Sequence, residues 1–94
     1  MFDMTGFQRD IMFVVAGMND PKGLAIKKQL EEAYGKDVNH GRLYPNLDEL
    51  VKAGLLEKGE KDRRTNEYRL TESGEEAIRD RTDWQSSRAS EVLA

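Results

Sequence analysis

The spacing of apolar residues changes along the chain, and the order of these spacings limits the possible folds more than any other feature. A period of three to four positions, typical of amphipathic helices, occurs in three consecutive segments, residues 5–18, 22–34 and 39–53. Residues 55–60 and 66–70 are short strand candidates instead. The chain is therefore expected to form three helices before its first strand.

Residues that start and stop helices stand at the ends of these segments. Thr5 and Asn39 are good N-caps for the first and third helices, and Pro21 suits the first position of the second. Gly35 is expected to end the second helix and Gly54 the third. The second and third helices are thus joined by a very short turn.

The polar residues 61–65 are expected to join the two strands as a hairpin loop. Thr71 then caps a last helix that reaches at least Trp84, while residues 85–94 are expected to fray. The predicted fold is mainly α with a small β-hairpin, in the helix-helix-helix-hairpin-helix order of a winged helix-turn-helix. In that plan the third helix enters the major groove of DNA.

The length of 94 residues fits one domain with a modest core. The absence of cysteine excludes disulfides and thiolate metal sites, and a single histidine, His40, argues against a metal site or a His-based catalytic cluster. No catalytic motif or phosphate-binding loop is found, so neither enzyme activity nor a cofactor is expected. No apolar run approaches the roughly 18–20 residues that cross a bilayer, and no signal-peptide pattern opens the chain, so the cytoplasm is the expected compartment.

The net charge of −3 argues by itself against nucleic-acid binding, because DNA-binding surfaces are usually basic. The charges are unevenly distributed, however. Residues 71–94 carry six acidic and three basic residues, so residues 1–70 have no net charge. The adjacent Arg63 and Arg64 in the polar loop are the sharpest basic feature, and a loop of this kind can reach phosphates or the minor groove.

The third helix is the expected DNA-reading element. When Leu43, Leu47 and Leu50 face the core, the outward residues of its N-terminal half are small or cationic. Arg42 is then placed for a bidentate contact with a guanine, worth about 1–3 kcal/mol of discrimination, and the positive helix end suits a phosphate. The alternative is an ordinary solvated helix face. The candidate DNA-binding residues are Asn39, His40, Gly41, Arg42, Tyr44, Pro45 and Asn46 in the helix, and Lys61, Arg63, Arg64, Thr65 and Asn66 in the wing.

Pro45 stands in the interior of the third helix, where proline removes a hydrogen bond and costs up to roughly 3 kcal/mol. It is expected to distort the helix locally and to leave the carbonyl of Gly41 free. The distortion either serves function or is simply tolerated.

The last helix is sparsely apolar, and one small domain cannot bury every such face. Trp84 packs either on its own core or against a second subunit. Helix-turn-helix proteins usually bind DNA as two-fold dimers, so we favour the second reading and an inverted-repeat DNA site. Within a single domain of residues 1–94, residues 72–94 are the expected dimerisation helix. The candidate interface residues are Met12, Phe13, Ile78, Trp84 and Val92.

Across residues 39–57 the sequence resembles the PadR family of transcriptional regulators. The residues that carry this resemblance are Gly41, Leu43, Tyr44, Pro45, Leu47, Leu50, Gly54 and Leu55, and a later set, Tyr68, Leu70, Thr71 and Gly74, is similar to the family's strand-then-helix ending. The resemblance extends over about residues 7–80. It implies a winged-helix fold, cytoplasmic transcription control and a homodimer joined through terminal helices. The acidic balance and short chain are similar to haloarchaeal members, and no small-molecule effector is implied.

These features predict a sequence-specific DNA-binding transcription regulator, a dimeric repressor that acts by promoter occlusion on double-stranded DNA. The alternative is a winged-helix module that binds another protein and no DNA. The acidic total favours that alternative, whereas the Arg42 face and the wing arginines favour DNA.

Overall fold

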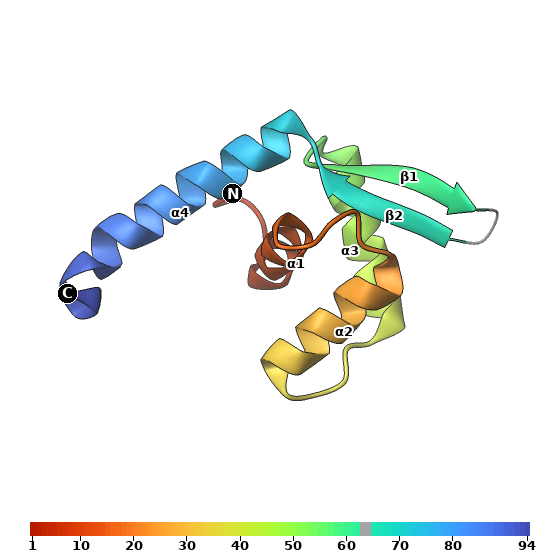
Figure 1. Ribbon diagram of the computed structural model, residues 1–94, viewed down its shortest axis with the longest axis horizontal. Coiled ribbons are helices and arrows are strands. Elements are labelled where there is room, and N and C mark those ends of the chain that lie inside the picture. The colour runs from red at the N-terminus through yellow and green to blue at the C-terminus, as the bar shows by residue number, and fades with distance from the viewer. Residues whose placement is uncertain (63–64) are drawn as a thin grey trace.

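The computed structural model of the chain describes residues 1–62 and 65–94. Its elements, in order, are α1 (Gly6–Ala16), α2 (Gly23–Tyr34), α3 (His40–Lys52), β1 (Leu56–Asp62), β2 (Thr65–Leu70) and α4 (Glu72–Leu93). The strands form one antiparallel hairpin. The winged helix-turn-helix order expected from the sequence is therefore confirmed. Figure 1 shows the hairpin and the far end of α4 pointing in opposite directions along the longest axis.

The helix caps follow from local chemistry. Thr5 Oγ1 accepts a hydrogen bond from the Gln8 backbone N–H at 3.1 Å, and the Gln8 side chain accepts one from the Thr5 N–H at 3.2 Å. These two bonds complete a capping box at the start of α1. Asn39 caps α3 and Thr71 caps α4, as expected. Gly35 ends α2 in the left-handed conformation, with φ of 69°.

Pro21 lies before the N-cap of α2, so its expected place at the first helical position is wrong. The Tyr68 N–H donates to the Pro21 carbonyl at 2.9 Å, and Lys22 forms an isolated antiparallel bridge with Glu67. This pairing holds residues 21–22 extended beside β2. The helix consequently begins at Gly23.

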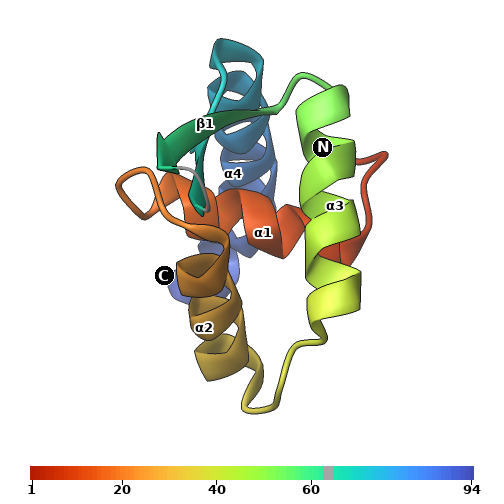
Figure 2. The same ribbon diagram turned by 90° about the vertical axis from the view of Figure 1, so that its right-hand side faces the viewer.

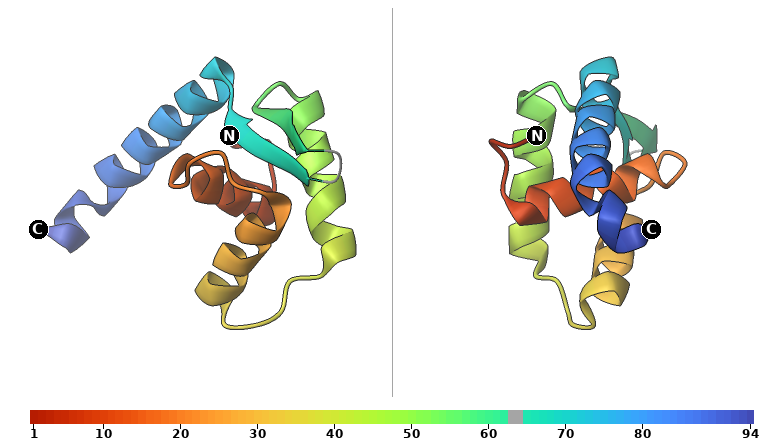
Figure 3. Two further views of the ribbon diagram at one scale, coloured as in Figure 1. Left: turned by 45° about the vertical axis from the view of Figure 1, so that its right-hand side comes forward. Right: turned by 90° about the vertical axis from the view of Figure 1, so that its left-hand side faces the viewer.

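The core lies between the first three helices and the hairpin, and α2 and α3 flank α1 in Figure 2. Leu43, Leu47 and Leu50 face inward, as their spacing predicts. Met12 is fully buried as well, so its expected place in a dimer interface is wrong. Met12 lies off the main apolar stripe of α1, but α4 packs across α1 (Figure 3). Gly74 of α4 approaches the Met12 side chain on that flank.

The hairpin strands are longer than the sequence predicts. Residues 61–65 were expected to form a loop, yet β1 continues to Asp62 and β2 begins at Thr65. Leu56 pairs with Leu70, and the register shifts between Glu60 and Asp62. Strand pairing joins backbone groups, so polar side chains do not prevent it. Residues 63–64 lie outside the described residues.

The first turn of α4 is fixed against the segment that follows α3. The Thr71 hydroxyl donates to the Gly54 carbonyl at 2.6 Å, and the Thr71 N–H donates to the Leu55 carbonyl at 3.1 Å. Gly74 is buried, and a Cβ added to it would lie 2.2 Å from the Leu55 carbonyl oxygen. The helix then continues to Leu93, through the segment expected to fray.

Gly74→Ala is therefore expected to lower the free energy of unfolding by about 1–3 kcal/mol, because backbone must move to admit the methyl group. Urea unfolding followed by circular dichroism measures the loss. Gly6→Ala is the matched control, since nothing lies within 4 Å of a Cβ at Gly6. Equal stability of the two variants would contradict the tight contact at Leu55.

Candidate nucleic-acid interface

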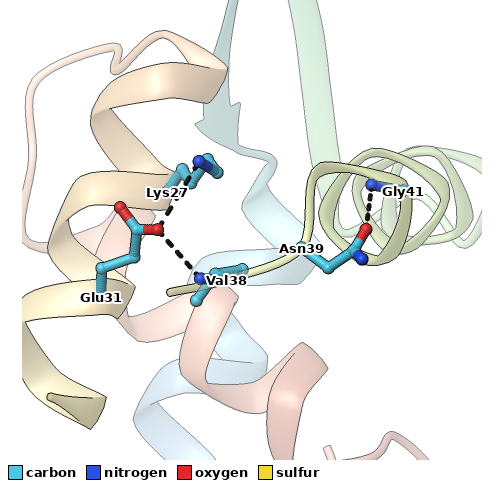
Figure 4. A network of polar contacts seen from close by, with 5 residues as sticks. All are labelled: Lys27, Glu31, Val38, Asn39 and Gly41. Atoms are coloured by element: carbon cyan, nitrogen blue, oxygen red, sulfur yellow. Dashed lines mark hydrogen bonds and ion pairs between the residues drawn. The ribbon is translucent and has the colours of Figure 1, made fainter. Parts of the chain in front are cut away.

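The turn between α2 and α3 sets the position of α3. Glu31 Oε2 accepts a hydrogen bond from the Val38 N–H at 2.9 Å and lies 3.5 Å from Lys27 Nζ (Figure 4). The backbone N–H of Val38 lowers the pKa of Glu31 below its ordinary value of 4.5, because it stabilises the carboxylate. One residue further on, Asn39 Oδ1 accepts from the Gly41 N–H at 2.7 Å. Two side chains, one from α2 and one from the N-cap of α3, thus fix the end of the turn that leads into α3.

The candidate residues of α3 are divided between exposed and half-buried positions. Asn39, His40, Gly41, Arg42 and Pro45 are exposed, whereas Tyr44 and Asn46 are half-buried. The His40 and Tyr44 rings lie with their centroids 4.3 Å apart. The Gly41 amide is already bonded to Asn39, so this amide does not contribute to the phosphate site expected at the end of α3.

Pro45 does not interrupt α3, which is helical on both sides of it. Proline has no N–H, so the carbonyl of Gly41 lacks its usual intrahelical partner, as expected. The side chain of Asn46 donates to the next carbonyl, that of Arg42, at 2.7 Å. The exposed ring of Pro45 adds an apolar surface to the outer face of the helix.

A groove of about 240 Å³ joins α3 to the hairpin and to the start of α2. Its lining residues are Lys22, Gly23, Leu24, Tyr44, Thr65, Asn66 and Tyr68. Three candidate residues predicted separately from the helix and the wing, Tyr44, Thr65 and Asn66, therefore meet in one groove. Burial raises the pKa of the Tyr68 phenol at its floor, and Asp48 and Tyr44 add to this effect.

The first turn of α2 is a part of this surface that sequence reasoning missed. Its N-cap is Lys22, which makes no capping hydrogen bond through its side chain. The first amides of a helix lack intrahelical partners and carry a partial positive charge, which suits a phosphate. The signal in the sequence is a lysine where a serine, threonine, aspartate or asparagine is the usual cap.

Arg42 lies on the flank of α3 that faces α1. Its guanidinium lies 3.9 Å from the centroid of the Phe7 ring. A cation stacked in this way is held in place by the ring while the N–H groups at its edge stay able to donate. The wing candidate Lys61 belongs to β1. The wing candidates Arg63 and Arg64 lie outside the described residues.

The acidic residues of α3 are paired with neighbouring elements. Asp48 Oδ1 lies 3.8 Å from Lys58 Nζ on β1, and Glu49 Oε2 accepts a hydrogen bond from Gln8 Nε2 at 2.7 Å. Exposed pairs of this kind stabilise a fold only weakly. Their effect here is to hold both carboxylates to the sides of α3.

Neither a metal-binding cluster nor a membrane-spanning helix is present in residues 1–62 and 65–94. That part of the chain contains no group of His, Asp and Glu side chains arranged to hold a metal ion. None of its helices is both long enough and apolar enough to span a bilayer.

A hairpin beside a helix-turn-helix, with a groove between them, defines a winged helix-turn-helix protein. Residues 12–80 match the transcriptional regulator PadR-like family. RosR of H. salinarum, in crystals grown from NaBr, is 55% identical over 92% of this chain and 77% of its own, with a TM-score of 0.88. The protein in the hsRosR-S1 complex is 54% identical over 93% of this chain and 77% of its own, with a TM-score of 0.90. The chain belongs to the PadR-like family of transcriptional regulators.

More distant structures share the fold. FabT of Streptococcus pneumoniae, in complex with DNA, is 20% identical over 97% of this chain and 61% of its own, with a TM-score of 0.79. Comparison with curated proteins gave no match. The resemblance seen in the segment around Tyr44 and Pro45 is thus confirmed at the level of the family.

Glu31→Gln is expected to destabilise the protein near neutral pH and much less in acid. The native pKa of Glu31 is lowered, so its stabilising charge is present above pH 4.5 and is lost as the pH falls through the native pKa. Glutamine keeps an oxygen that accepts from Val38 but lacks the charge. Urea unfolding at about pH 7 and about pH 3 measures the difference from the unmodified protein.

Glu32→Gln is the control, because Glu32 is an exposed neighbour of Glu31 and its replacement removes the same charge. If Glu31→Gln lowers the free energy of unfolding equally at both pH values, or by no more than the control does, the Glu31 carboxylate does not hold the turn.

Proposed function

We propose that the protein binds double-stranded DNA sequence-specifically in the cytoplasm and represses transcription by occluding a promoter. The observation that carries this proposal is the groove in which the start of α2, Tyr44 of α3, and Thr65 and Asn66 of the wing meet. A winged helix-turn-helix protein contacts DNA with these three elements. Membership in a family of transcriptional regulators supports the same function.

The distribution of charge supports this function despite the net charge of −3. Six of the 18 acidic residues are in α4, which points away from the hairpin (Figure 1). The carboxylates of Asp48 and Glu49 are held by Lys58 and Gln8. The face formed by α3 and the wing is therefore less acidic than the whole chain.

Each part of the surface has a distinct role in the proposal. The exposed residues at the N-terminal end of α3 enter the major groove, where Arg42 donates to a guanine and Pro45 contributes an apolar contact. The first turn of α2, with Lys22, binds a phosphate. The wing binds phosphates or the minor groove through Lys61, Arg63, Arg64, Thr65 and Asn66.

A homodimer joined through α4 is part of the same proposal. The Trp84 ring packs edge-on against Phe2 of its own chain at 5.2 Å, with the guanidinium groups of Arg81 and Arg88 over it. The Trp84 side chain nevertheless stays 39% exposed, and Val92 is 86% exposed. We assign the interface to Ile78, Trp84 and Val92 of α4 together with the half-buried Phe13, so that two α3 helices read an inverted repeat.

Arg42→Ala is expected to weaken binding to a selected duplex by about tenfold and to relax the preference for one guanine, since it removes a bidentate donor. Selection from random duplexes first defines the site, and fluorescence anisotropy then measures affinity. Arg79→Ala is the control, because this exposed arginine of α4 pairs with Glu75, away from the groove.

Three outcomes would contradict parts of the proposal. Unchanged affinity of Arg42→Ala, with the fold intact, would remove Arg42 from the reading residues. Selection of no DNA at all would overturn DNA binding and would favour the protein-binding alternative. A footprint that does not overlap the promoter of a bound gene would contradict occlusion.

Trp84→Ala is expected to shift a dimer of 10.8 kDa chains towards monomer and to weaken binding to the full inverted repeat more than to a half-site. Light scattering at micromolar concentration measures the mass. Thr82→Ala, which changes another exposed α4 residue, is the control. An unmodified chain that is monomeric would exclude the dimer, and a dimeric Trp84→Ala would place Trp84 outside its interface.

A further inference from the structure

Gln8 of α1 has every polar atom of its side chain engaged, and two of its three partners belong to α3. Its Oε1 accepts from the Thr5 N–H at 3.2 Å, which is the capping contact. Its Nε2 donates to Asn46 Oδ1 at 2.9 Å and to Glu49 Oε2 at 2.7 Å. One amide group therefore joins the start of α1 to the DNA-facing helix.

The contact with Gln8 orders further groups of α3. Because Asn46 Oδ1 accepts from Gln8, its Nδ2 faces the Arg42 carbonyl and donates to it at 2.7 Å. Both ends of the Asn46 amide are used within the protein. Asn46 is therefore suited to fixing the helix rather than to contacting a base, which was its expected role.

The contact with Glu49 matters for a different reason. Glu49 is exposed and lies seven residues after Arg42, so it shares with Arg42 the flank of α3 that faces α1. A carboxylate released from Gln8 can turn towards the phosphates, where like charges repel. The donor group of Gln8 holds this carboxylate on the α1 side instead.

We propose that Gln8 is a positioning residue for DNA binding, which holds the Glu49 carboxylate and the Asn46 amide on the α1 side of α3. This inference rests on the proposed DNA binding and deepens it. Helix α1 lies outside the helix-turn-helix and the wing. In this proposal it determines where the negative charge of Glu49 lies on the DNA-binding surface.

Gln8→Glu is the sharpest test, because glutamate keeps the acceptor of the capping box but replaces the donor with a charge that repels Glu49. Affinity for the selected duplex is expected to fall by about five- to tenfold. Gln29→Glu is the matched control: it adds the same charge at an exposed position of α2 that lines a different groove. Its affinity is expected to stay within about twofold of the unmodified protein.

The double variant Gln8→Glu with Glu49→Gln exchanges amide and carboxylate, so it restores a donor–acceptor pair and the original net charge. It is expected to recover affinity to within about twofold. Equal losses for Gln8→Glu and Gln29→Glu, or no recovery in the double variant, would overturn the proposal. If Gln8→Glu does not fold, Gln8→Ala replaces it. This variant also frees the Glu49 carboxylate, and adding Glu49→Gln is expected to restore affinity because it removes the released charge.

A measurement without DNA separates this inference from DNA binding itself. In NMR spectra, Glu49→Gln is expected to shift the side-chain amide protons of Gln8, and an unshifted signal would overturn the contact. If the Gln8 signal shifts but the unmodified protein selects no DNA, the proposed function has failed and the positioning role in DNA binding fails with it.

Discussion

The close approach of Tyr44 to Gly23 is the contact on which the candidate interface depends. A Cβ at Gly23 would lie 2.4 Å from the Tyr44 hydroxyl oxygen, so only glycine lets the ring lie against the start of α2. The Tyr68 N–H holds the same segment from the other side through the Pro21 carbonyl. The first turn of α2, the middle of α3 and the base of the wing are thereby fixed relative to one another. The groove that these three elements line depends on this contact.

The structure also shows how an acidic chain can present a surface suited to a polyanion. Acidic residues are concentrated in α4, while Asp48 and Glu49 on α3 are each held by a partner from another element. These contacts add little stability because they are exposed. Their consequence is spatial, since they determine on which side of α3 the negative charge lies.

Local chemistry explains which parts of the fold were predictable from sequence. Caps such as Thr5 and Asn39 act within three residues, and the inward leucines of α3 follow its helical period. The burial of Met12 was not predictable, because it depends on where α4 crosses α1. The pairing of residues 21–22 with β2 was not predictable either, since it joins segments more than forty residues apart without a side-chain pattern.

The same distinction applies to the site. Tyr44, Thr65 and Asn66 were identified from their places in an expected fold, and they do line one groove. These three positions follow from the order of the helices and strands alone.

The N-termini of α2 and α3 explain why the phosphate site is proposed at α2 and not, as expected from the sequence, at α3. At α3 the Gly41 N–H already donates to the Asn39 cap, although that end was the expected phosphate site. At α2 no side chain performs this function, and Lys22 adds a positive charge. A cap that strengthens a helix competes with a phosphate for the same N–H groups. Under the proposed function, the well-capped α3 is therefore suited to reading bases, and the first turn of α2 to binding a phosphate.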